Sequence, residues 1–453
     1  SITAASMTLS PSSLAIGAEW PRPGAELPAL RISASAGWRH EGVRMGLRGD
    51  GGGLRSAGAG FPLVDEMELG DRTGDVTVGA ASVEWGAGAE RSRVATALEL
   101  PLLYLECEGG SVTWRTKLTA PVVDAVPDGT RLLLRSEATG ERALFAVRSG
   151  RLAYERDGSG LHLTWRGGRR LVLVAIAAQD EADLDRSIDL LARRELSGLG
   201  RQRNQHAEQL HRGGVAVELP EPADAGALVE WAKVHADARL GAWIARGGNS
   251  GSRDAAESLA RGLLAAGLSE RPRALLRMGS GKAESFSRLR ERYRAWVGEA
   301  PDQGQGERPA LPAEGHLGTG PWQAPSLAEI AAGRASDRDI GSVLTELIEG
   351  AWGVSPDAPH GAVAVAPILP AEWSRLALSR LRVGRSVLDV RLRRRGETVG
   401  FAVRRGAGPR IAVRCTVRGV PVREMLLDGE PIGGTEARFD AEAEHHILLH
   451  TGP

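Results

Sequence analysis

The helical middle of the chain is the feature that most restricts its fold. The interval from Pro222 to Gly350 holds 129 residues, and Glu299–Pro325 within it is rich in Pro, Gly and Gln, which is typical of an irregular connection. Helices of about 12 residues with connections of about five leave room for five or six helices. Ser336 is the expected N-cap of the last one. Apolar spacing predicts helices near 224–246, 254–267, 270–278, 282–297, 326–332 and 337–349.

Both flanks of this interval read as β-structure. Before Asp180 the chain consists of short, partly alternating runs bounded by Gly, Pro or Asp, which predicts an antiparallel sandwich. Gly109-Gly110 and Asp157-Gly158 are expected to be hairpin turns. After Trp352 the alternation returns, most clearly at Ser386–Leu392, and predicts a second sandwich.

These patterns predict an α+β multidomain protein. Residues 1–179 are expected to form an N-terminal antiparallel β-sandwich, and 180–221 a helical linker that ends in a short apolar strand. Residues 222–350 are expected to form an incomplete, toroid-like α-helical region, and 351–453 a C-terminal β-sandwich.

Charge and cysteine content exclude several classes of function. The 57 basic residues balance 57 acidic ones, so no net positive field favours binding to nucleic acid. Two distant cysteines, Cys107 and Cys415, can build neither a disulfide framework nor a structural zinc site. His206 and His211 are five residues apart, a spacing that does not place both on one helical face as metal ligands. We therefore predict no metal site and no cofactor.

The same features predict where the protein resides. No window reaches the roughly 20 consecutive apolar residues of a membrane helix. The first residues lack the basic start and the apolar stretch of a signal peptide. Together with two unpaired cysteines, this favours the cytoplasm. A processed N-terminus leaves export open, and peripheral attachment to a membrane is a further alternative.

Three stretches carry a resemblance to a known family. Ala351–Asp357 followed by Val365–Trp373 contains the pattern P-x-L-P-x-x-W, and Leu228–Lys233 and Gly251–Ala256 precede it in the chain. In this order they resemble the glycogen-debranching and glucoamylase-like glycosidases, whose catalytic unit is an (α/α)6 toroid between β domains. Gly251–Ala256 is similar to the family's G-x-x-R-D segment, with one residue fewer between Gly and Arg. The resemblance implies that Leu228–Lys233 lies in the first toroid helix.

The helical interval departs from that family in length. Twelve helices with their connections need on the order of 200 residues, so the resemblance implies a toroid that is cut roughly in half. The middle hairpin, which carries the family's general acid, falls in the missing part. Glycoside cleavage needs two carboxyl groups across one bond, and the remaining candidates are Asp254 and Glu314. The alternatives are a helix-terminal role for Asp254 and a solvated loop for Glu314.

Tryptophan is unusually frequent, with 11 Trp against 5 Phe and 3 Tyr. Indole rings stack on sugar rings, so Trp243 and Trp322 are candidate stacking platforms. Filling of the core is the alternative explanation for the same composition.

The C-terminal region carries a strong excess of arginine. Residues 371–425 contain 14 Arg against four acidic residues. Along 388–395, period-2 alternation places the apolar side chains on one face and mostly cationic ones on the other. An ordinary solvated sheet face is one explanation, and a docking face for an acidic protein or an anionic membrane is the other. The candidate partner-binding residues are Arg391, Arg393, Arg395, Arg404 and Arg405.

Two classes of function follow from these observations. The first is a non-catalytic, glycosidase-like accessory subunit that docks on a larger protein assembly or lies at a membrane surface. The second is a carbohydrate-active protein, either a sugar-binding module or a shortened glycoside hydrolase acting on α-glucans.

Overall fold

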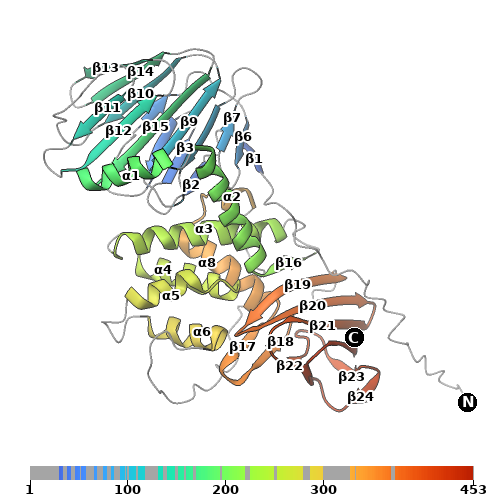
Figure 1. Cartoon of the computed structure of the whole chain (residues 1–453). Coiled ribbons are helices and arrows are strands. Elements are labelled where there is room, and N and C mark those ends of the chain that lie inside the picture. The colour runs from blue at the N-terminus through green and yellow to red at the C-terminus, as the bar shows by residue number, and fades with distance from the viewer. Residues whose placement is uncertain are drawn as a thin grey trace, which may run out of the picture.

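The computed structural model describes residues 30–33, 38–41, 46–50, 53–57, 66–68, 75–78, 83–85, 92–96, 98, 102–108, 111–117, 131–135, 140–147, 151–157, 160–166, 170–193, 196–219, 225–248, 252–278, 286–298, 327–331, 333–368 and 373–451. Within these residues the order is β-sheets, then helices, then β-sheets, and the helices lie between the two groups of sheets (Figure 1). The predicted α+β organisation is therefore confirmed at this level.

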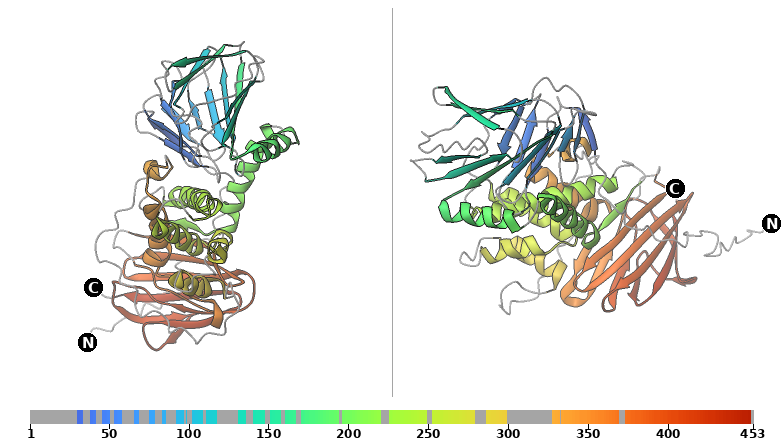
Figure 2. Two further views of the ribbon diagram at one scale, coloured as in Figure 1. Left: turned by 90° about the vertical axis from the view of Figure 1, so that its left-hand side faces the viewer. Right: turned by 45° about the horizontal axis from the view of Figure 1, so that its top comes forward.

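Two antiparallel sheets form the N-terminal part, and Figure 2 shows them facing each other. The first contains, in spatial order, β1 (Leu30–Ser33), β6 (Asp75–Val78), β7 (Val83–Trp85), β8 (Ser92–Thr96), β9 (Leu102–Glu108), β15 (Arg170–Ala178), β12 (Arg142–Val147) and β11 (Arg131–Arg135). The second contains β13 (Arg151–Asp157), β14 (Gly160–Arg166), β10 (Ser111–Lys117), β5 (Glu66–Glu68), β4 (Gly53–Ala57), β3 (Gly46–Asp50) and β2 (Trp38–Glu41). Alternate residues of the first sheet, such as Leu103, Leu105 and Phe145, are buried in the core.

One of the two predicted hairpins is wrong. β9 precedes Gly109-Gly110 and pairs with β8 and β15, whereas β10 follows it and pairs with β5 and β14. The chain therefore passes from one sheet to the other at this point, because a turn signal shows that the chain changes direction but does not select its next partner strand. The predicted hairpin at Asp157-Gly158 is confirmed, since β13 and β14 pair with Asp157 opposite Gly160.

Two helices and a short strand link the N-terminal sheets to the helical region. α1 (Glu181–Arg193) packs on β12 and β15, where Leu184 joins Leu102 and Ile176 in a small second core. α2 (Leu196–Gly213) continues toward the helical region (Figure 1). β16 (Ala216–Glu218) then pairs with a strand of the C-terminal sheets. The linker therefore contacts the N-terminal sheets through α1 and the C-terminal sheets through β16.

The described chain contains six α-helices between residues 225 and 345, as the length of the interval predicts. α6 begins at Ser287, because Phe286 adopts a left-handed backbone conformation directly before it, and the first residues of the predicted helix, 282–285, lie outside the described residues. The last predicted helix changes into a π-helical turn, η4 (Glu346–Ala351), after Thr345. The helices are α3 (Ala225–Ala245), α4 (Arg253–Ala265), α5 (Glu270–Met278), α6 (Ser287–Val297), α7 (Leu327–Ala331) and α8 (Asp337–Thr345).

A pair of glycines lets α4 and α8 approach closely. A Cβ atom added to Gly341 would lie 2.3 Å from the backbone oxygen of Ser258, and one added to Gly262 would lie 2.7 Å from the oxygen of Gly341. No side chain larger than hydrogen fits between the two backbones at these points. The buried residues Leu259, Leu263 and Leu344 surround this contact.

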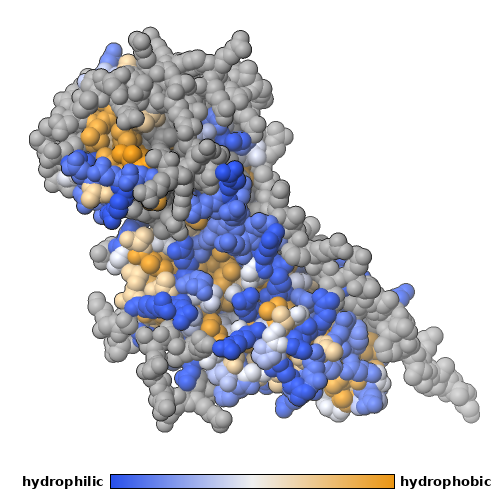
Figure 3. Space-filling view, viewed as in Figure 1, coloured by the Kyte–Doolittle hydropathy of each residue, from blue (hydrophilic) through white to orange (hydrophobic). Residues whose placement is uncertain are grey.

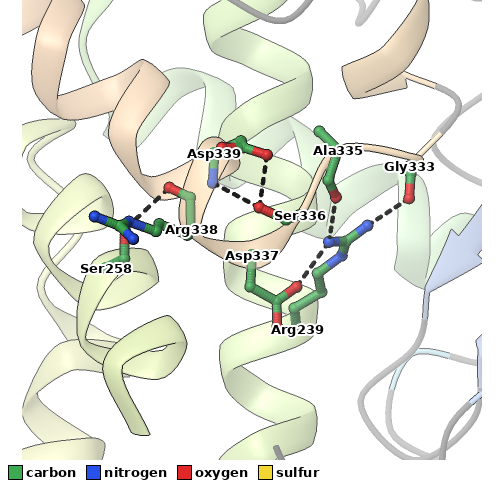
Figure 4. A network of polar contacts seen from close by, with 8 residues as sticks. All are labelled: Arg239, Ser258, Gly333, Ala335, Ser336, Asp337, Arg338 and Asp339. Carbon is green, nitrogen blue, oxygen red and sulfur yellow. Dashed lines mark hydrogen bonds and ion pairs between the residues drawn. The ribbon is translucent and has the colours of Figure 1, made fainter. Parts of the chain in front are cut away.

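A buried arginine of α3 holds the connection between α7 and α8 (Figure 4). The Arg239 guanidinium donates hydrogen bonds to the carbonyl oxygens of Gly333 (2.6 Å) and Ala335 (2.8 Å) and to the Asp337 carboxylate (2.7 Å). Ser336 caps α8, as predicted, because its Oγ accepts a hydrogen bond from the Asp339 N–H at 3.1 Å. The start of α8 is therefore tied to the middle of α3, the longest of the described helices.

Two further sheets form the C-terminal part. In the first, all strands are antiparallel: β16, β19 (Arg375–Val383), β20 (Ser386–Arg395), β21 (Thr398–Ala407), β26 (Glu444–Thr451), β23 (Val422–Leu427) and β24 (Glu430–Ile432). The second contains β17 (Ser355–Asp357), β18 (Ala362–Val365), β22 (Ile411–Cys415) and β25 (Ala437–Ala441), and the short helix η5 (Ala358–His360) connects its first two strands. β18 and β22 run parallel. Parallel pairing is possible here because the chain between β18 and β22 passes through β19, β20 and β21 of the other sheet.

Candidate functional site

The strongest sequence-predicted site residues meet where α3 ends and α4 and α6 begin. We call Trp243, Arg253, Asp254 and Phe286 the α3–α4 corner. Trp243 lies in the last turn of α3, Arg253 and Asp254 open α4, and Phe286 directly precedes α6. Three helices thus bring together side chains that are up to 43 positions apart in the sequence.

The aromatic rings of the corner hold Arg253 in a defined orientation. The Arg253 Cζ lies 4.5 Å from the centroid of the Phe286 ring, a cation–π contact. Trp243 packs edge to face on Phe286, with centroids 6.4 Å apart and ring planes at 83°. Arg253 is exposed although Phe286 is buried. Stacking on Phe286 therefore orients the guanidinium of a side chain that is otherwise exposed.

The corner also contains backbone strain. Phe286 has φ of 63°, which non-glycine residues rarely adopt. Gly248 has φ of +76°, and a Cβ atom there would lie 2.8 Å from the indole of Trp243. The Trp243 Nε1 is buried and, among the described residues, has no hydrogen-bond partner. Such strain is common at binding sites, where the surrounding structure enforces it.

Asp254 is exposed in the first turn of α4, where a carboxylate also stabilises the helix dipole. Glu257 follows one turn later and lies on the same side of the helix. Sequence reasoning missed Glu257 and the role of Phe286. The helical spacing from Asp254 could have indicated the first, but no local signal could have indicated the second, because Phe286 stacks on a residue 33 positions away.

Other carboxylates of the helical region are buried in ionic networks. On α3, Glu230 contacts the Lys233 Nζ at 2.8 Å and the His211 Nδ1 at 2.9 Å. Lys233 is fully buried, and desolvation, only partly offset by Glu230, lowers its pKa from its usual value to about 8. These groups have no access to a ligand in solvent, so their contribution is structural.

The predicted arginine stripe is partly occupied by contacts within the sheet. Arg391 is only 8% exposed. The Asp389 carboxylate accepts a hydrogen bond from Arg404 at 3.0 Å, and Arg405 donates to the carbonyl oxygens of Glu442 and Gly408. Arg393 is half-buried and Arg395 is exposed. The cationic character of this face is therefore concentrated at the end of β20.

Two candidates, Glu314 and Trp322, lie outside the described residues. Within the residues that are described, no group of three or more His, Cys, Asp or Glu side chains could hold a metal ion. None of the helices in the described part of the chain has the length and the apolar character needed to cross a bilayer.

Comparisons with known proteins support the fold. No protein-family model matches the sequence, and no curated protein matches it either. A solved structure assigned as a kojibiose phosphorylase from the human microbiome matches 94% of this chain and 99% of its own, with a TM-score of 0.50 and 6% identity. A bacterial glucoamylase complexed with acarbose matches with a TM-score of 0.32 and 8% identity, over 56% of this chain and 50% of its own.

At these low sequence identities the likeness concerns the fold alone, and it rests on the first match, which has the TM-score of 0.50. The chain therefore shares the overall fold of the structure assigned as a kojibiose phosphorylase.

Proposed function

We propose that this chain is a shortened glycosidase-type protein that binds α-linked gluco-oligosaccharides at the α3–α4 corner. The observation that carries the proposal is the stacking of Arg253 on Phe286 beside the exposed Asp254. Arg253 and Asp254 lie in the segment that resembles the G-x-x-R-D sequence of the glycosidases. A fixed guanidinium edge and a carboxylate beside it can together donate to and accept from neighbouring sugar hydroxyls.

Hydrolysis at this corner would require two carboxyl groups. The described residues provide Asp254 and Glu257 on one side of α4. One would have to donate a proton to the leaving oxygen while the other acts as nucleophile or activates a water molecule. In this proposal Asp254, at the start of α4, takes the second role, and Glu257, one turn later, takes the first.

Replacing Arg253 with methionine is expected to weaken binding of maltotetraose or maltoheptaose by about tenfold or more, because charge-assisted hydrogen bonds are lost. Isothermal titration calorimetry measures this change in affinity directly.

Asp254→Asn is expected to abolish any release of glucose or of aryl leaving groups. Arg277→Met, which changes an exposed arginine at the end of α5, is the matched control and should bind as the wild type does. Absence of saturable binding to any oligosaccharide in the wild type would refute the proposal.

Docking on an acidic protein partner is the second candidate function. It is favoured by one observation: Arg375 on β19 lies directly opposite Arg393 on β20. Glu218 of β16 pairs with Arg375 at 2.6 Å, so this edge already holds one carboxylate, and an acidic partner would pair with the exposed Arg395 beside it in the same way. Arg395 extends the same cationic edge.

Charge reversal tests this second candidate. In the complex isolated from the native host at low salt, Arg393→Glu combined with Arg395→Glu is expected to release the partner, as increasing salt should. Arg423→Glu, at an exposed position of β23, should leave the complex intact. A partner that is indifferent to both salt and the double reversal contradicts docking at this edge.

A further inference from the structure

β13 is an edge strand of the N-terminal sheets. Among the described strands it pairs with β14 and with no other, and it lies on the side of these sheets that is turned away from the helices (Figure 1). The strand has seven residues, none of them Gly or Pro. Ala153, Tyr154 and Glu155 in its middle are exposed. An exposed edge of this length is a template for pairing with a further strand.

Two other sheet edges carry features that oppose such pairing. β24, at the edge of a C-terminal sheet, contains Pro431, which has no N–H to donate. β11, at the edge of the other N-terminal sheet, begins and ends with arginine, so symmetric pairing of two copies would set like charges opposite each other. β13 has neither feature, because its two ends, Arg151 and Asp157, have opposite charges.

The hairpin with β14 determines which peptide groups of β13 are directed to its outer side. A two-residue turn places Asp157 opposite Gly160, and the two residues that flank such a turn exchange both of their hydrogen bonds. Hydrogen-bonded and non-hydrogen-bonded pairs alternate along antiparallel strands, so the odd-numbered residues of β13 bond to β14. The N–H and C=O groups of the even-numbered residues, with Tyr154 at their centre, therefore point away from β14.

We propose that β13 pairs with β13 of a second copy of this chain, antiparallel and two-fold symmetric, with Tyr154 at the axis. This inference is independent of the proposed carbohydrate site. Tyr154 of one copy then lies opposite Tyr154 of the other, and Leu152 of each copy lies opposite Arg156 of the other. Each of these pairs exchanges two hydrogen bonds, because both of its members direct their peptide groups outward. The dimer joins two seven-stranded sheets into one continuous sheet.

The residues of β13 are complementary in this register. Arg151 of each copy lies opposite Asp157 of the other, so opposite charges meet at both ends of the paired strands. Tyr154 is 37% exposed, and in the dimer its ring packs against its own copy across the axis. Glu155 lies opposite Ala153, so this register sets no like charges opposite each other. It also pairs all seven residues, whereas a shift in either direction leaves the strand ends unpaired.

Sedimentation equilibrium of the full chain tests the dimer. With rising concentration the wild type is expected to reach twice the chain mass of 47.9 kDa. Tyr154→Pro removes an outward N–H without removing a bond to β14, so the chain should fold while the dissociation constant rises about tenfold or more. Tyr154→Phe, the matched control, should associate as the wild type does. A wild type that stays monomeric at about 200 μM overturns the proposal, as does a dimer that is indifferent to Tyr154→Pro.

Cysteine cross-linking tests the register. In a hydrogen-bonded pair the two Cα atoms are about 5.5 Å apart, within the range of a disulfide, so Tyr154→Cys is expected to give a covalent dimer under mild oxidation. The two copies of residue 153 are separated by two positions along the strands, roughly 7 Å, in addition to the spacing between strands, which is too far for a disulfide. Ala153→Cys should therefore stay uncross-linked, as the wild type should. Cross-linking of Ala153→Cys in place of Tyr154→Cys contradicts the proposed axis.

A charge exchange covers the case in which Tyr154→Pro does not fold. Arg151→Asp alone sets like charges opposite each other at both ends of the paired strands, and is expected to raise the dissociation constant about fivefold to tenfold. Adding Asp157→Arg makes the opposed charges opposite again and should recover the wild-type constant. A double variant that associates no better than Arg151→Asp rules out pairing in this register.

Discussion

Replacing Gly341 with alanine is expected to lower the free energy of unfolding by about 2–3 kcal/mol, near the upper end of the cost of overpacking. The new methyl group would lie 2.3 Å from the backbone oxygen of Ser258. A backbone atom cannot rotate away as a side chain can, so α4 and α8 would have to separate and lose packing in the core. The higher helix propensity of alanine offsets only about 1 kcal/mol of this cost. Urea denaturation followed by circular dichroism measures the change.

Gly433 provides the matched control for this substitution. A Cβ atom there would meet no atom within 4 Å, and its φ lies outside the left-handed region. Gly433→Ala should therefore stay within about 0.5 kcal/mol of the wild type. Equal stability of the Gly341→Ala variant and this control would show that α4 and α8 do not pack as described.

Replacing Glu230 with alanine is expected to cost about 3–5 kcal/mol at pH 7, because it leaves the charge of Lys233 buried without its carboxylate. Lys233 is fully buried and keeps only a hydrogen bond to the Val215 carbonyl oxygen, at 3.0 Å. Adding Lys233→Met removes the charge at similar volume and should restore most of the loss. Thermal and urea unfolding of the two single variants and the double variant form a double-mutant cycle that isolates the pair.

The pH dependence of this effect has a defined sign. The pKa of Lys233 is lowered to about 8 in the folded protein, whereas an unfolded lysine has a pKa of about 10.4. Between these values the unfolded chain binds more protons, so the contribution of Lys233 to stability rises with pH. The defect of Glu230→Ala should therefore shrink from pH 7 to pH 9.5. A defect of constant size, or a double variant no better than Glu230→Ala, would contradict this account.

Local patterns were sufficient to predict most elements of the helical region. The apolar stripe of Leu289, Tyr293 and Trp296 repeats at helical spacing, and all three residues are buried in α6. Ser336 caps α8 through its own side chain, a contact that depends on residues only three positions apart. The start of α6 at Ser287 could not be predicted from the apolar stripe, which does not indicate the left-handed conformation of Phe286 directly before the helix.

The sequence predicted only some of the residues of the candidate site. Asp254 and Trp243 could be singled out by motif and by residue type, and both lie at the α3–α4 corner. Their connection runs through Phe286, which a helical stripe identifies only as a core residue. The burial of Arg391 was equally hidden, because alternation along one strand does not show what covers its outer face.

The sequence by itself determined the order of β-sheets, helices and β-sheets, the positions of the helices and the apolar face of β20, where Leu388, Val390 and Leu392 are fully buried. These properties follow from periodicity and end signals within a few residues. The tertiary structure decided that β9 and β10 belong to different sheets, that β16 joins β19, and that His206 and His211 face carboxylates of α3. Each of these contacts joins residues that lie tens or hundreds of positions apart in the sequence. Many segments of the chain could form the same hydrogen bonds and ion pairs, so the partner is selected only when the whole chain packs.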